Sequence, residues 1–436
     1  MRTTIHPTTE GVLNDDAGST VRRSVLPSGV RVLTEAMPGV RSVTIGYWIA
    51  VGSRDEAEHQ YGSTHFLEHL LFKGTRTRSA MDIAAEFDAA GGESNAMTGK
   101  ESTCYYARVL DTDLPIAAEV LTDLVTSAVI DAQEMETERG VILEELAMAE
   151  DDPTDVVHER FSEQVLSDHP LGRPIGGTTA AIRAAAREDV VDHYRRWYRP
   201  EELVITAAGG VDHDQLVGLV AEALEGSDWD VSGRGEPAPR RVGDVQTIPV
   251  REGVAHHRKG IEQSQVIIGG RGLAAGDQDR FALSLMHAIL GGGMSSRLFQ
   301  EVRERRGLAY ATYSFSAGFT DAGYFGLYAG CLPEKVDIVT EVMVAELERI
   351  ASEPVTAEEL ARAKGQLRGG TVLGMEDTAS RMNRLGRAEL VRGEFVDISD
   401  SLAEIEAVTA EDIARVARRL AESPRATTLV GPSAQA

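Results

Sequence analysis

Two histidines and a glutamate, His65, Glu68 and His69, stand within five residues of one another in the run Gly62–Thr75. In a helix, successive residues are rotated by about 100°, so positions i, i+3 and i+4 share one face. Two imidazoles one turn apart can bind the same metal ion, and neutral imidazole is a good zinc ligand. Bound zinc lowers the pKa of a water toward about 7, and a nearby carboxylate can take its proton. The spacing therefore predicts a zinc site with a general base beside it.

Such a zinc site needs a third protein ligand, and the acidic stretch 134–146 offers candidates. Its spacing predicts a second helix, although Gly140 lowers the helix propensity. Glu138 and Glu145 are two turns apart and so lie on one face, whereas Glu144 points about 100° away from Glu145. A solvated acidic helix that binds no metal has the same pattern. Helix geometry alone does not choose between Glu144 and Glu145.

Together, the H-x-x-E-H run and the acidic stretch resemble the pitrilysin family of inverzincin zinc peptidases. The likeness is greatest to its short branch, which includes mitochondrial processing peptidase and small bacterial homologues. In that family a Glu ligand follows the second His by about 76 residues, and Glu145 stands there. The resemblance implies that His65, His69 and Glu145 bind Zn2+, that Glu68 is the general base, and that Glu138 is a supporting carboxylate in catalysis.

The length and charge of the chain limit its class and partners. A chain of 436 residues favours two domains of about 200 residues each. With 42% hydrophobic and 26% charged residues, the composition is typical of a soluble globular protein. The formal net charge of -25 argues against nucleic acid and anionic membrane surfaces as partners, because both attract basic patches. It is compatible with basic or neutral peptides.

Neither the cysteines nor the first residues indicate export. Cys104 and Cys331 fit no zinc-finger spacing and suggest no disulfide framework, which fits a reducing compartment. The start, Met1 to Val21, lacks the apolar core of a signal peptide. No window approaches the roughly 18 apolar residues of a membrane span. We therefore expect a cytoplasmic protein.

The coarse pattern predicts two domains and a linker. Residues 1–20 are polar and are expected to form a mobile lead-in, followed by a zinc-binding domain over 21–225. Residues 226–249, rich in Gly, Pro, Ser, Asp and Arg, are the best linker candidate, and 250–436 would be the second domain. Residue types and spacing predict strands at 31–35, 42–51, 203–210 and 265–270, and helices at 80–90, 114–127, 133–148 and 156–166.

The two halves look like copies of one another. The stretch 182–190 recurs in form at 405–413, and Arg195-Arg196 matches Arg418-Arg419 at the same offset. A Glu-Asp helix cap arising twice by chance would explain part of the likeness. The common offset over several residues favours duplication, which the resembled family also shows. Because the second half has no H-x-x-E-H, only the first would hold metal.

Two further pairs of residues take a role from the resemblance. Residues 92–107 end in a strand-like run, and in the family a similar stretch is an edge strand to which substrate adds as an extra strand. The resemblance gives this substrate role to Asn95 and Ala96, although an ordinary hairpin with an exposed Asn fits the residues as well.

The second pair is Arg303 and Tyr310, after the glycine-rich run 291–293. Glycines before a helix can bind phosphate, but no Lys-Ser/Thr pair follows here, and Arg-rich helix ends are common on surfaces. In the family an Arg and a Tyr seven residues apart approach the zinc from the facing half. A cation and a phenol there could stabilise the substrate and the oxyanion of the tetrahedral intermediate.

The resemblance implies an α+β fold of two homologous domains, each an antiparallel sheet covered by helices. It implies a zinc endopeptidase that hydrolyses peptides or unfolded segments in a chamber closed by two chains. One chain carries a zinc half-site and an Arg/Tyr half-site, so a homodimer is the simplest arrangement. The alternative is a non-catalytic structural homologue within a larger complex, like the core subunits of respiratory complexes. Such scaffolds typically lose parts of the metal motif, which is complete here.

Overall fold

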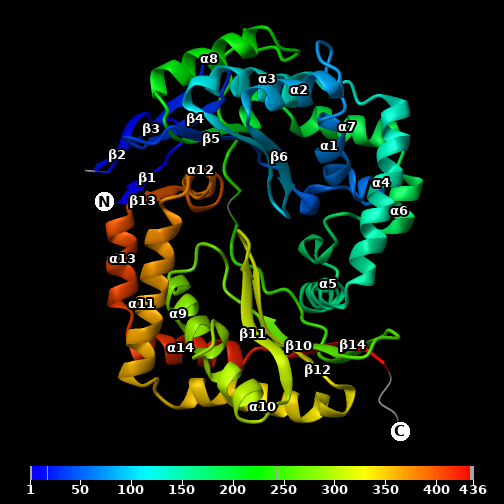
Figure 1. The fold of residues 1–436 in the computed structure, drawn as a ribbon, viewed down its shortest axis with the longest axis vertical. Helices are drawn as coiled ribbons and strands as arrows, with labels where there is room; N and C mark the ends of the chain where they lie inside the picture. The colour runs from blue at the N-terminus through cyan, green and yellow to red at the C-terminus, as the bar shows by residue number, and fades with distance from the viewer. Residues whose placement is uncertain (1, 17, 242, 433–436) are drawn as a thin grey trace. The chain divides into compact units, whose positions relative to one another are not determined.

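The computed structural model describes residues 2–16, 18–241 and 243–432, which form two compact units (Figure 1). Unit 1 comprises Met1–Leu146, Pro174–Arg241 and Leu373–Asp397; unit 2 comprises Ala147–Arg173, Val242–Val372 and Ile398–Ala436. The structure thus divides the chain differently from the contiguous domains 21–225 and 250–436 that we expected. Each unit takes one segment from the other half of the sequence.

Unit 1 is built on a seven-stranded sheet with the strand order β2-β3-β4-β8-β5-β7-β6. Strands β4 and β8 are parallel and the other neighbours are antiparallel, so the sheet is mixed rather than antiparallel as expected. The strands are β2 (Gly11–Asp16), β3 (Ser19–Val25), β4 (Arg31–Ala36), β5 (Ser42–Ile49), β6 (Glu93–Thr98), β7 (Thr103–Leu110) and β8 (Leu203–Gly209).

Residues 1–20, expected as a mobile lead-in, contain two paired strands. β2 pairs with β3 at the sheet edge, and β1 (Arg2–Thr4) pairs with β13 (Glu394–Val396). Ile5 and Leu13 are buried in a hydrophobic cluster with Trp48 and Phe395. The segment is polar in composition, but these two apolar residues and main-chain pairing attach it to unit 1.

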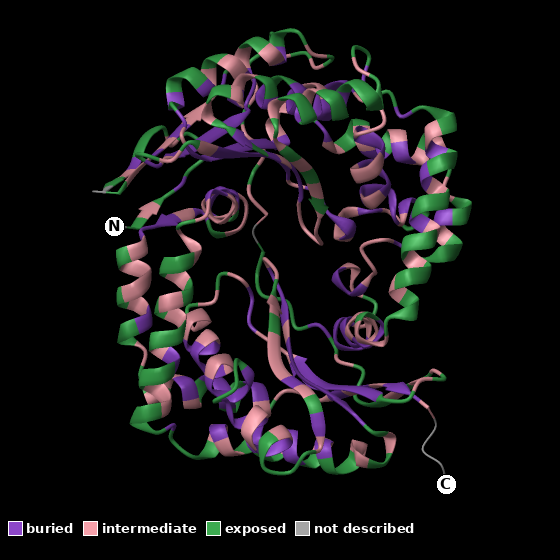
Figure 2. Ribbon diagram, viewed as in Figure 1, coloured by how far each residue is buried: buried purple, intermediate pink, exposed green. Residues whose placement is uncertain are grey.

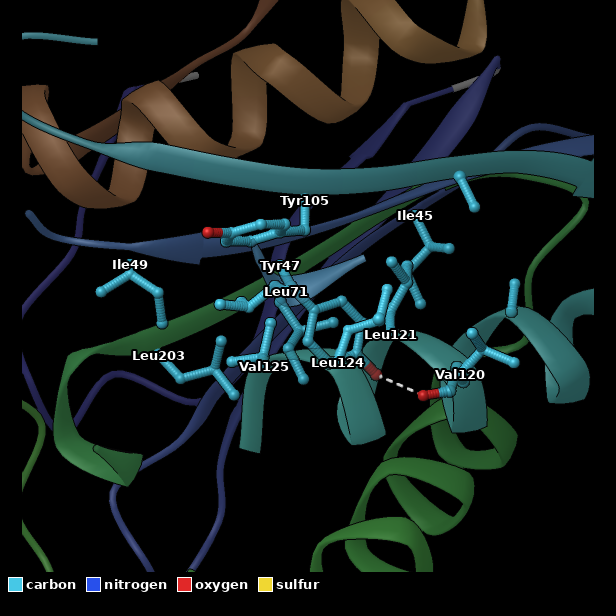
Figure 3. Close-up of a cluster of buried hydrophobic side chains, with 14 of the residues drawn as sticks. Ile45, Tyr47, Ile49, Leu71, Tyr105, Val120, Leu121, Leu124, Val125 and Leu203 are labelled. Carbon is cyan, nitrogen blue, oxygen red and sulfur yellow. Dashed lines mark hydrogen bonds between the residues drawn. The ribbon is translucent and has the colours of Figure 1, made fainter. Parts of the chain in front are cut away.

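Helices cover one face of this sheet and form the main core of unit 1 with it. They include α1 (Ser63–Leu71), α2 (Ala80–Ala90), α3 (Leu114–Ser127) and α8 (His213–Glu225). Figure 3 shows side chains of β5 meeting those of α3. There the buried Tyr47 hydroxyl donates to the main-chain oxygen of Ala118 at 3.0 Å. Further along are α4 (Ala132–Asp151), α6 (Thr179–Ala184) and α7 (Arg187–Trp197).

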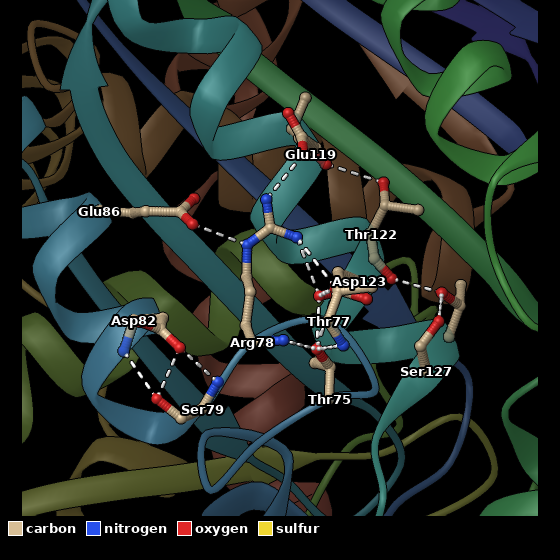
Figure 4. A network of polar contacts seen from close by, with 12 residues as sticks. Thr75, Thr77, Arg78, Ser79, Asp82, Glu86, Glu119, Thr122, Asp123 and Ser127 are labelled. Atoms are coloured by element: carbon tan, nitrogen blue, oxygen red, sulfur yellow. Dashed lines mark hydrogen bonds and ion pairs between the residues drawn. The ribbon is translucent and has the colours of Figure 1, made fainter.

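The loop after α1 is fixed by a single arginine (Figure 4). The Arg78 guanidinium pairs with Glu86 of α2 at 2.9 Å, and with Glu119 at 2.7 Å and Asp123 at 2.9 Å on α3. These carboxylates raise the pKa of Arg78 although burial opposes them. The network links the end of α1 to two neighbouring helices.

The other face of the sheet is covered by α12 (Thr378–Arg387), which packs on β4, β5 and β8. Its anchor is Glu35, a fully buried carboxylate on β4. Glu35 accepts hydrogen bonds from Arg381 and from Arg384, the latter at 3.0 Å. A buried charge is tolerated when it is paired in this way. This anchor is why a segment from late in the sequence belongs to unit 1.

Unit 2 has a five-stranded sheet with the order β11-β12-β10-β14-β9. Here β14 and β9 are parallel and the remaining pairs antiparallel, so this sheet is also mixed. Its central strands are largely buried (Figure 2). The strands are β9 (Gly253–Arg258), β10 (Ser264–Arg271), β11 (Ala309–Gly318), β12 (Gly323–Cys331) and β14 (Ala426–Gly431).

The helices of unit 2 repeat the arrangement of unit 1. One hydrophobic core joins the sheet to α9 (Arg280–Gly291), α10 (Val336–Ser352) and α14 (Ala410–Ala421). A second cluster joins β10 and β14 to α5 (Pro153–Leu166), which comes from the first half of the sequence. The remaining helices are α11 (Ala357–Gly374) and α13 (Ile398–Ala407). No helix in the described ranges is long and apolar enough to span a bilayer.

Candidate metal centre

Helix α1 presents the sequence motif because its other faces are buried. It begins after Gly62, whose φ of 87° lies in the left-handed region that favours glycine. The Glu56 carboxylate accepts hydrogen bonds from the main-chain N–H groups of Gly62 at 2.9 Å and Thr64 at 2.8 Å, and so caps the helix. The apolar side chains Phe66, Leu67, Leu70 and Leu71 pack into the core. His65, Glu68 and His69 remain on the less buried face.

The acidic stretch is helical, as its spacing predicted, in spite of Gly140. Helix α4 buries Met135 and Ile142, and Asp131 caps it by accepting from the main-chain N–H of Gln133 at 2.7 Å. Arg139 connects this helix to its surroundings. It donates to the main-chain oxygens of Ile182 and Ala185, and its guanidinium lies 5.6 Å from the ring centre of Phe66 on α1.

His65, His69 and Glu145 come together, with one possible ligand atom from each lying within 4.8 Å of the others. Glu145 Oε2 is 3.7 Å from His65 Nε2 and 3.4 Å from His69 Nε2. Within the described ranges this is the one group of three or more such residues that could hold a metal ion, and Glu144 is not part of it. Two imidazoles and a carboxylate match the donor set of a catalytic zinc site with three protein ligands.

The protonation of His65 also suits a metal ligand. Burial, and secondly the neighbouring His69, lower the pKa of His65 below its ordinary value. The neutral imidazole that a metal requires is therefore favoured. Behind the ring lies Gly176, where a Cβ atom would stand 3.6 Å from His65 Nδ1 and 3.0 Å from a Leu146 methyl group. The lack of a side chain at this position avoids a tight contact with Leu146, whereas a Cβ atom would meet the His65 ring only at ordinary van der Waals distance.

Glu138 lies beside the group rather than in it. Its carboxylate is buried and reaches His69 Nδ1 at 2.9 Å and Lys73 Nζ at 2.7 Å. Burial raises the pKa of Glu138, but hydrogen bonds from Lys73 and His69 outweigh it and leave that pKa below its usual value. A carboxylate at the second ring nitrogen of a ligand histidine fixes the ring orientation and makes the imidazole a stronger ligand.

A threonine that the sequence did not single out contacts the predicted general base. Thr98 Oγ1, on β6, donates a hydrogen bond to Glu68 Oε2. Lys73, four residues after His69, is a second residue that the pattern missed. Neither has a local signal, because each acts through a residue brought close by the fold. The family pattern indicates only the partners of these residues, Glu68 and Glu138.

Asn95 and Ala96 both lie on β6, which contacts α1. Among the described strands β6 is a sheet edge and pairs with β7 alone. The side chains of β6 alternate between exposed and half-buried, and Asn95 is one of the exposed ones. Its Oδ1 accepts a hydrogen bond from the Ala96 main-chain N–H at 2.8 Å. The structure thus places both residues on a free strand edge beside the motif helix.

Arg303 and Tyr310 lie together in unit 2. The Arg303 guanidinium is 4.5 Å from the Tyr310 ring centre and donates to the Tyr310 main-chain oxygen at 3.2 Å. Arg303 is on a π-helical segment, Phe299–Glu304, that follows the glycine-rich run 291–293. Segments of π-helix are rare in proteins, and those that occur are frequently found at functional sites. Tyr310 is 75% exposed at the start of the edge strand β11.

Two family models match this chain. The model for the insulinase family, peptidase family M16, matches residues 31–179, and the model for the peptidase M16 inactive domain matches 184–367. The first match contains every residue of the metal group. The second contains Arg303 and Tyr310.

Whole-chain relatives agree with these matches. An uncharacterized zinc protease of Streptomyces coelicolor is 48% identical over 95% of this chain and 90% of its own. One from Mycobacterium tuberculosis is 48% identical over 94% and 93%, and one from Bacillus subtilis is 36% identical over 95% and 98%.

Solved structures share the fold. A protease from Helicobacter pylori has a TM-score of 0.85 at 23% identity, covering 95% of this chain and all of that one. An M16-like peptidase structure from Alicyclobacillus acidocaldarius has a TM-score of 0.84 at 21% identity, covering 97% of this chain and all of its own. With relatives 48% identical along nearly its whole length, this chain belongs to the peptidase M16, or insulinase, family of zinc proteases.

Proposed function

We propose that this protein is a zinc-dependent endopeptidase whose metal is held by His65, His69 and Glu145. The observation that carries the proposal is the convergence of these three ligand atoms within 4.8 Å. When bound, Zn2+ would polarise the scissile carbonyl and lower the pKa of a water molecule. Glu138 would hold the His69 ring with Nε2 directed toward the ion.

In this proposal Glu68 is the general base. Thr98 binds one carboxylate oxygen of Glu68, Oε2, and leaves Oε1 for a proton. A base must stand within hydrogen-bond reach of the proton that it takes. The Thr98 contact would hold the carboxylate in one orientation while the proton is transferred and then passed to the leaving amine.

The substrate would bind along β6. An extended peptide that adds to a free strand edge is held by main-chain hydrogen bonds, so its side chains are read weakly. Near Ala96, a main-chain carbonyl of the substrate would replace Asn95 Oδ1 as the acceptor of the hydrogen bond from the Ala96 main-chain N–H. Peptides or unfolded segments of varied sequence are therefore the expected substrates.

The metal content tests the ligand set, with a matched control on the same helix. Purified protein should contain about one zinc per chain, and Glu145→Gln should lose most of it. The neighbouring exposed Glu144→Gln should retain zinc, because Glu144 lies outside the group. Equal zinc content in both variants would refute the assignment. Zinc-loaded protein that cleaves no unfolded protein would instead favour the non-catalytic scaffold.

We further propose a homodimer in which Arg303 and Tyr310 serve the zinc site of the partner chain. One metal group and one Arg/Tyr pair per sequence make this the simplest symmetric arrangement. A Glu68→Gln chain mixed with an Arg303→Ala/Tyr310→Phe chain tests it. In the mixed dimer one site carries both defects and the other carries neither, so about a quarter of the unsubstituted activity should return after equal mixing.

Subunit exchange must be verified with differently tagged chains. If exchange is proven and no activity returns, the shared-site arrangement is refuted. Arg303 and Tyr310 would then act within their own chain or have a structural role.

A further inference from the structure

A cavity of about 550 Å³ lies within unit 2. Its walls are the segments 245–248, 271–272, 322–323 and 415–424, with Val165 and Leu166 from the end of α5. Pockets of this volume accommodate small organic molecules. No residue of the metal group or of the Arg303/Tyr310 pair lines it, so the proposed peptidase reaction leaves it unexplained.

Four arginines line this cavity, and two of them are neutralised by carboxylates. Arg415 pairs with Asp279 at 2.6 Å and with Asp412 at 2.7 Å, and Arg419 pairs with Asp277 at 2.8 Å. These arginines have structural partners and need no ligand.

The other two, Arg271 and Arg418, have no side-chain hydrogen bond or ion pair to any residue that the structure describes. The Nε atom of Arg271 is buried and lacks a hydrogen-bond partner, although the main-chain N–H of the same residue donates to Ser423 Oγ at 3.0 Å. Buried polar groups are almost always hydrogen-bonded, and a missing partner indicates a ligand, water or ion. One carboxylate, that of Glu422, also lines the cavity.

The walls around Arg271 and Arg418 are held in place and are partly apolar, which suits a bound ligand. Gln246 holds the 245–248 wall through two hydrogen bonds to Asp321, from its main-chain N–H and from its side chain, both at 2.7 Å. Val165, Leu166 and Ile248 give the cavity an apolar side. In a chain with a net charge of -25, two arginines in one cavity that form no ion pair, even with the Glu422 carboxylate in the same wall, are unexpected.

We propose that this cavity binds a small organic anion with a phosphate or carboxylate head and an apolar body. Guanidinium groups bind both oxyanions through paired N–H donors in a planar fork. Arg271 and Arg418 would hold the head, and Val165, Leu166 and Ile248 would contact the body. The proposal does not depend on zinc or on peptidase activity.

Calorimetric titration of the full-length protein with three probes at constant ionic strength tests it. Phenyl phosphate and benzoate carry the two candidate heads on one apolar ring, and phenol carries the ring without the anion. Saturable binding of either anion, with none for phenol, supports the proposal, and the tighter anion identifies the head. Absence of saturable binding by both anions would overturn it.

Variants locate the binding. Arg418→Ala should fold, because this side chain is exposed and unpaired, and should weaken binding about tenfold, as expected for one charge-assisted contact. Arg271→Gln should weaken it at least as much. Arg368→Ala, an exposed arginine of α11 outside the cavity, should bind as the unsubstituted chain does. His65→Ala should also bind normally, which excludes a zinc-bound anion. Unchanged affinity in both cavity variants would refute the site.

Discussion

The two sheets repeat one five-stranded pattern, but among the residues that the structure describes only unit 1 holds a group of side chains that could bind a metal ion. The order β4-β8-β5-β7-β6 in unit 1 corresponds to β9-β14-β10-β12-β11 in unit 2, with the parallel pair in the same place. The repeated stretches also correspond: residues 182–190 span the turn between α6 and α7, and 405–413 the turn between α13 and α14. The cap is not what repeats, because Thr409 caps α14 whereas α7 begins without a side-chain cap.

Helix α4 is the second long helix after the β6–β7 hairpin, and α11 is the second after the β11–β12 hairpin. Comparison of these two helices shows which contacts the units share and which unit 2 lacks. Alignment of Gly140 in α4 with Gly365 in α11 pairs Arg139 with Lys364, and both side chains donate to main-chain oxygens of the helix pair that follows, at Ile182 and Glu406 respectively. The same alignment places Ala363 opposite Glu138 and Gly370 opposite Glu145. The contact that positions the helix persists, while the candidate ligand Glu145 and the carboxylate of Glu138 that supports His69 have no counterpart in α11.

His69 of unit 1 and His287 of unit 2 also differ in their carboxylate partners. His69 on α1 has a carboxylate at each ring nitrogen, from Glu138 and Glu145. His287 on α9, the helix after the equivalent strand β10, bonds only to Ser314 Oγ at 2.9 Å, and its buried Nε2 has no partner among the described residues. The fold therefore supplies a helix at this place in both units, and in unit 1 the facing acidic helix adds the carboxylate that completes a group able to hold a metal ion.

The largest effect is expected from Glu68→Gln. The change removes the base and no ligand, so zinc content should stay near one per chain while peptide cleavage falls by about 10²–10⁴-fold. Cleavage of a quenched fluorescent peptide and metal analysis measure both quantities. Glu358→Gln, an exposed glutamate at the start of α11 in unit 2, is the control and should change neither. A Glu68→Gln variant with most of its turnover would remove the proposed functional difference between the units.

A paired substitution sharpens the contrast between the histidines. His69→Ala should lose zinc and activity with little loss of stability, because this side chain is partly exposed and its main partners belong to the metal site. His287→Ala should keep zinc and instead destabilise the protein by about 1–3 kcal/mol, as expected for a buried polar side chain removed from a core. Zinc analysis and urea denaturation compare the two. Loss of zinc in His287→Ala would show that unit 2 has a part in metal binding.

Much of this organisation could be predicted from the sequence. The helices predicted at 80–90 and 114–127 match α2 and α3 residue for residue. For α2 the reason is local, since Ser79 and Asp82 form a capping box at its start and Gly91, in the left-handed region, ends it. The convergence of His65, His69 and Glu145 could be predicted as well, because the two histidines share one turn of helix and the family spacing supplies the glutamate.

The exchange of segments between the halves could not be predicted. In the sequence, Glu35 has the pattern of an ordinary polar residue in a strand. Its partner Arg381 is 346 residues away, so nothing local indicates the contact. Local periodicity describes which face of a helix is apolar but not which sheet receives it. The same limit applies to Thr98 and Lys73, whose roles depend on contacts between elements.

A moderate effect is expected from acidification. Burial lowers the pKa of His287 to about 4, whereas an unfolded histidine titrates near 6.5. The unfolded state thus binds the proton more tightly, and stability is lost as the pH falls from about 6.5 toward 4. Between pH 7 and pH 5 the contribution is about 2 kcal/mol. His287→Gln should reduce the difference between denaturation free energies measured at these two pH values by that amount.

His193 in unit 1 has the same property, because burial lowers its pKa to about 4 as well. Acid sensitivity should therefore remain in part in His287→Gln and disappear further in a variant that also carries His193→Gln. An unchanged pH dependence in the single variant would mean that His287 is not buried as a neutral ring.

The smallest effect is expected from the contact that both units share. Arg139→Met removes the bonds to Ile182 and Ala185 and the cation–π contact with Phe66, but it keeps a long apolar side chain between α4 and α1. Because Arg139 follows Glu138 directly and α4 also carries Glu145, a small shift of the helix changes the ligand distances. We expect zinc affinity to fall by no more than about tenfold, within the range for residues that orient metal ligands.

Lys364→Met removes the corresponding contact in α11, where no metal ligand lies, and should leave zinc affinity unchanged while both variants lose about 1 kcal/mol of stability. Competition with a chelator of known affinity measures the zinc constants, and Arg139→Lys should restore part of the loss by keeping a donor at this position. If Arg139→Met and Lys364→Met bind zinc equally well, the contact has only a structural role in both units, and the position of the metal ligands depends on other residues.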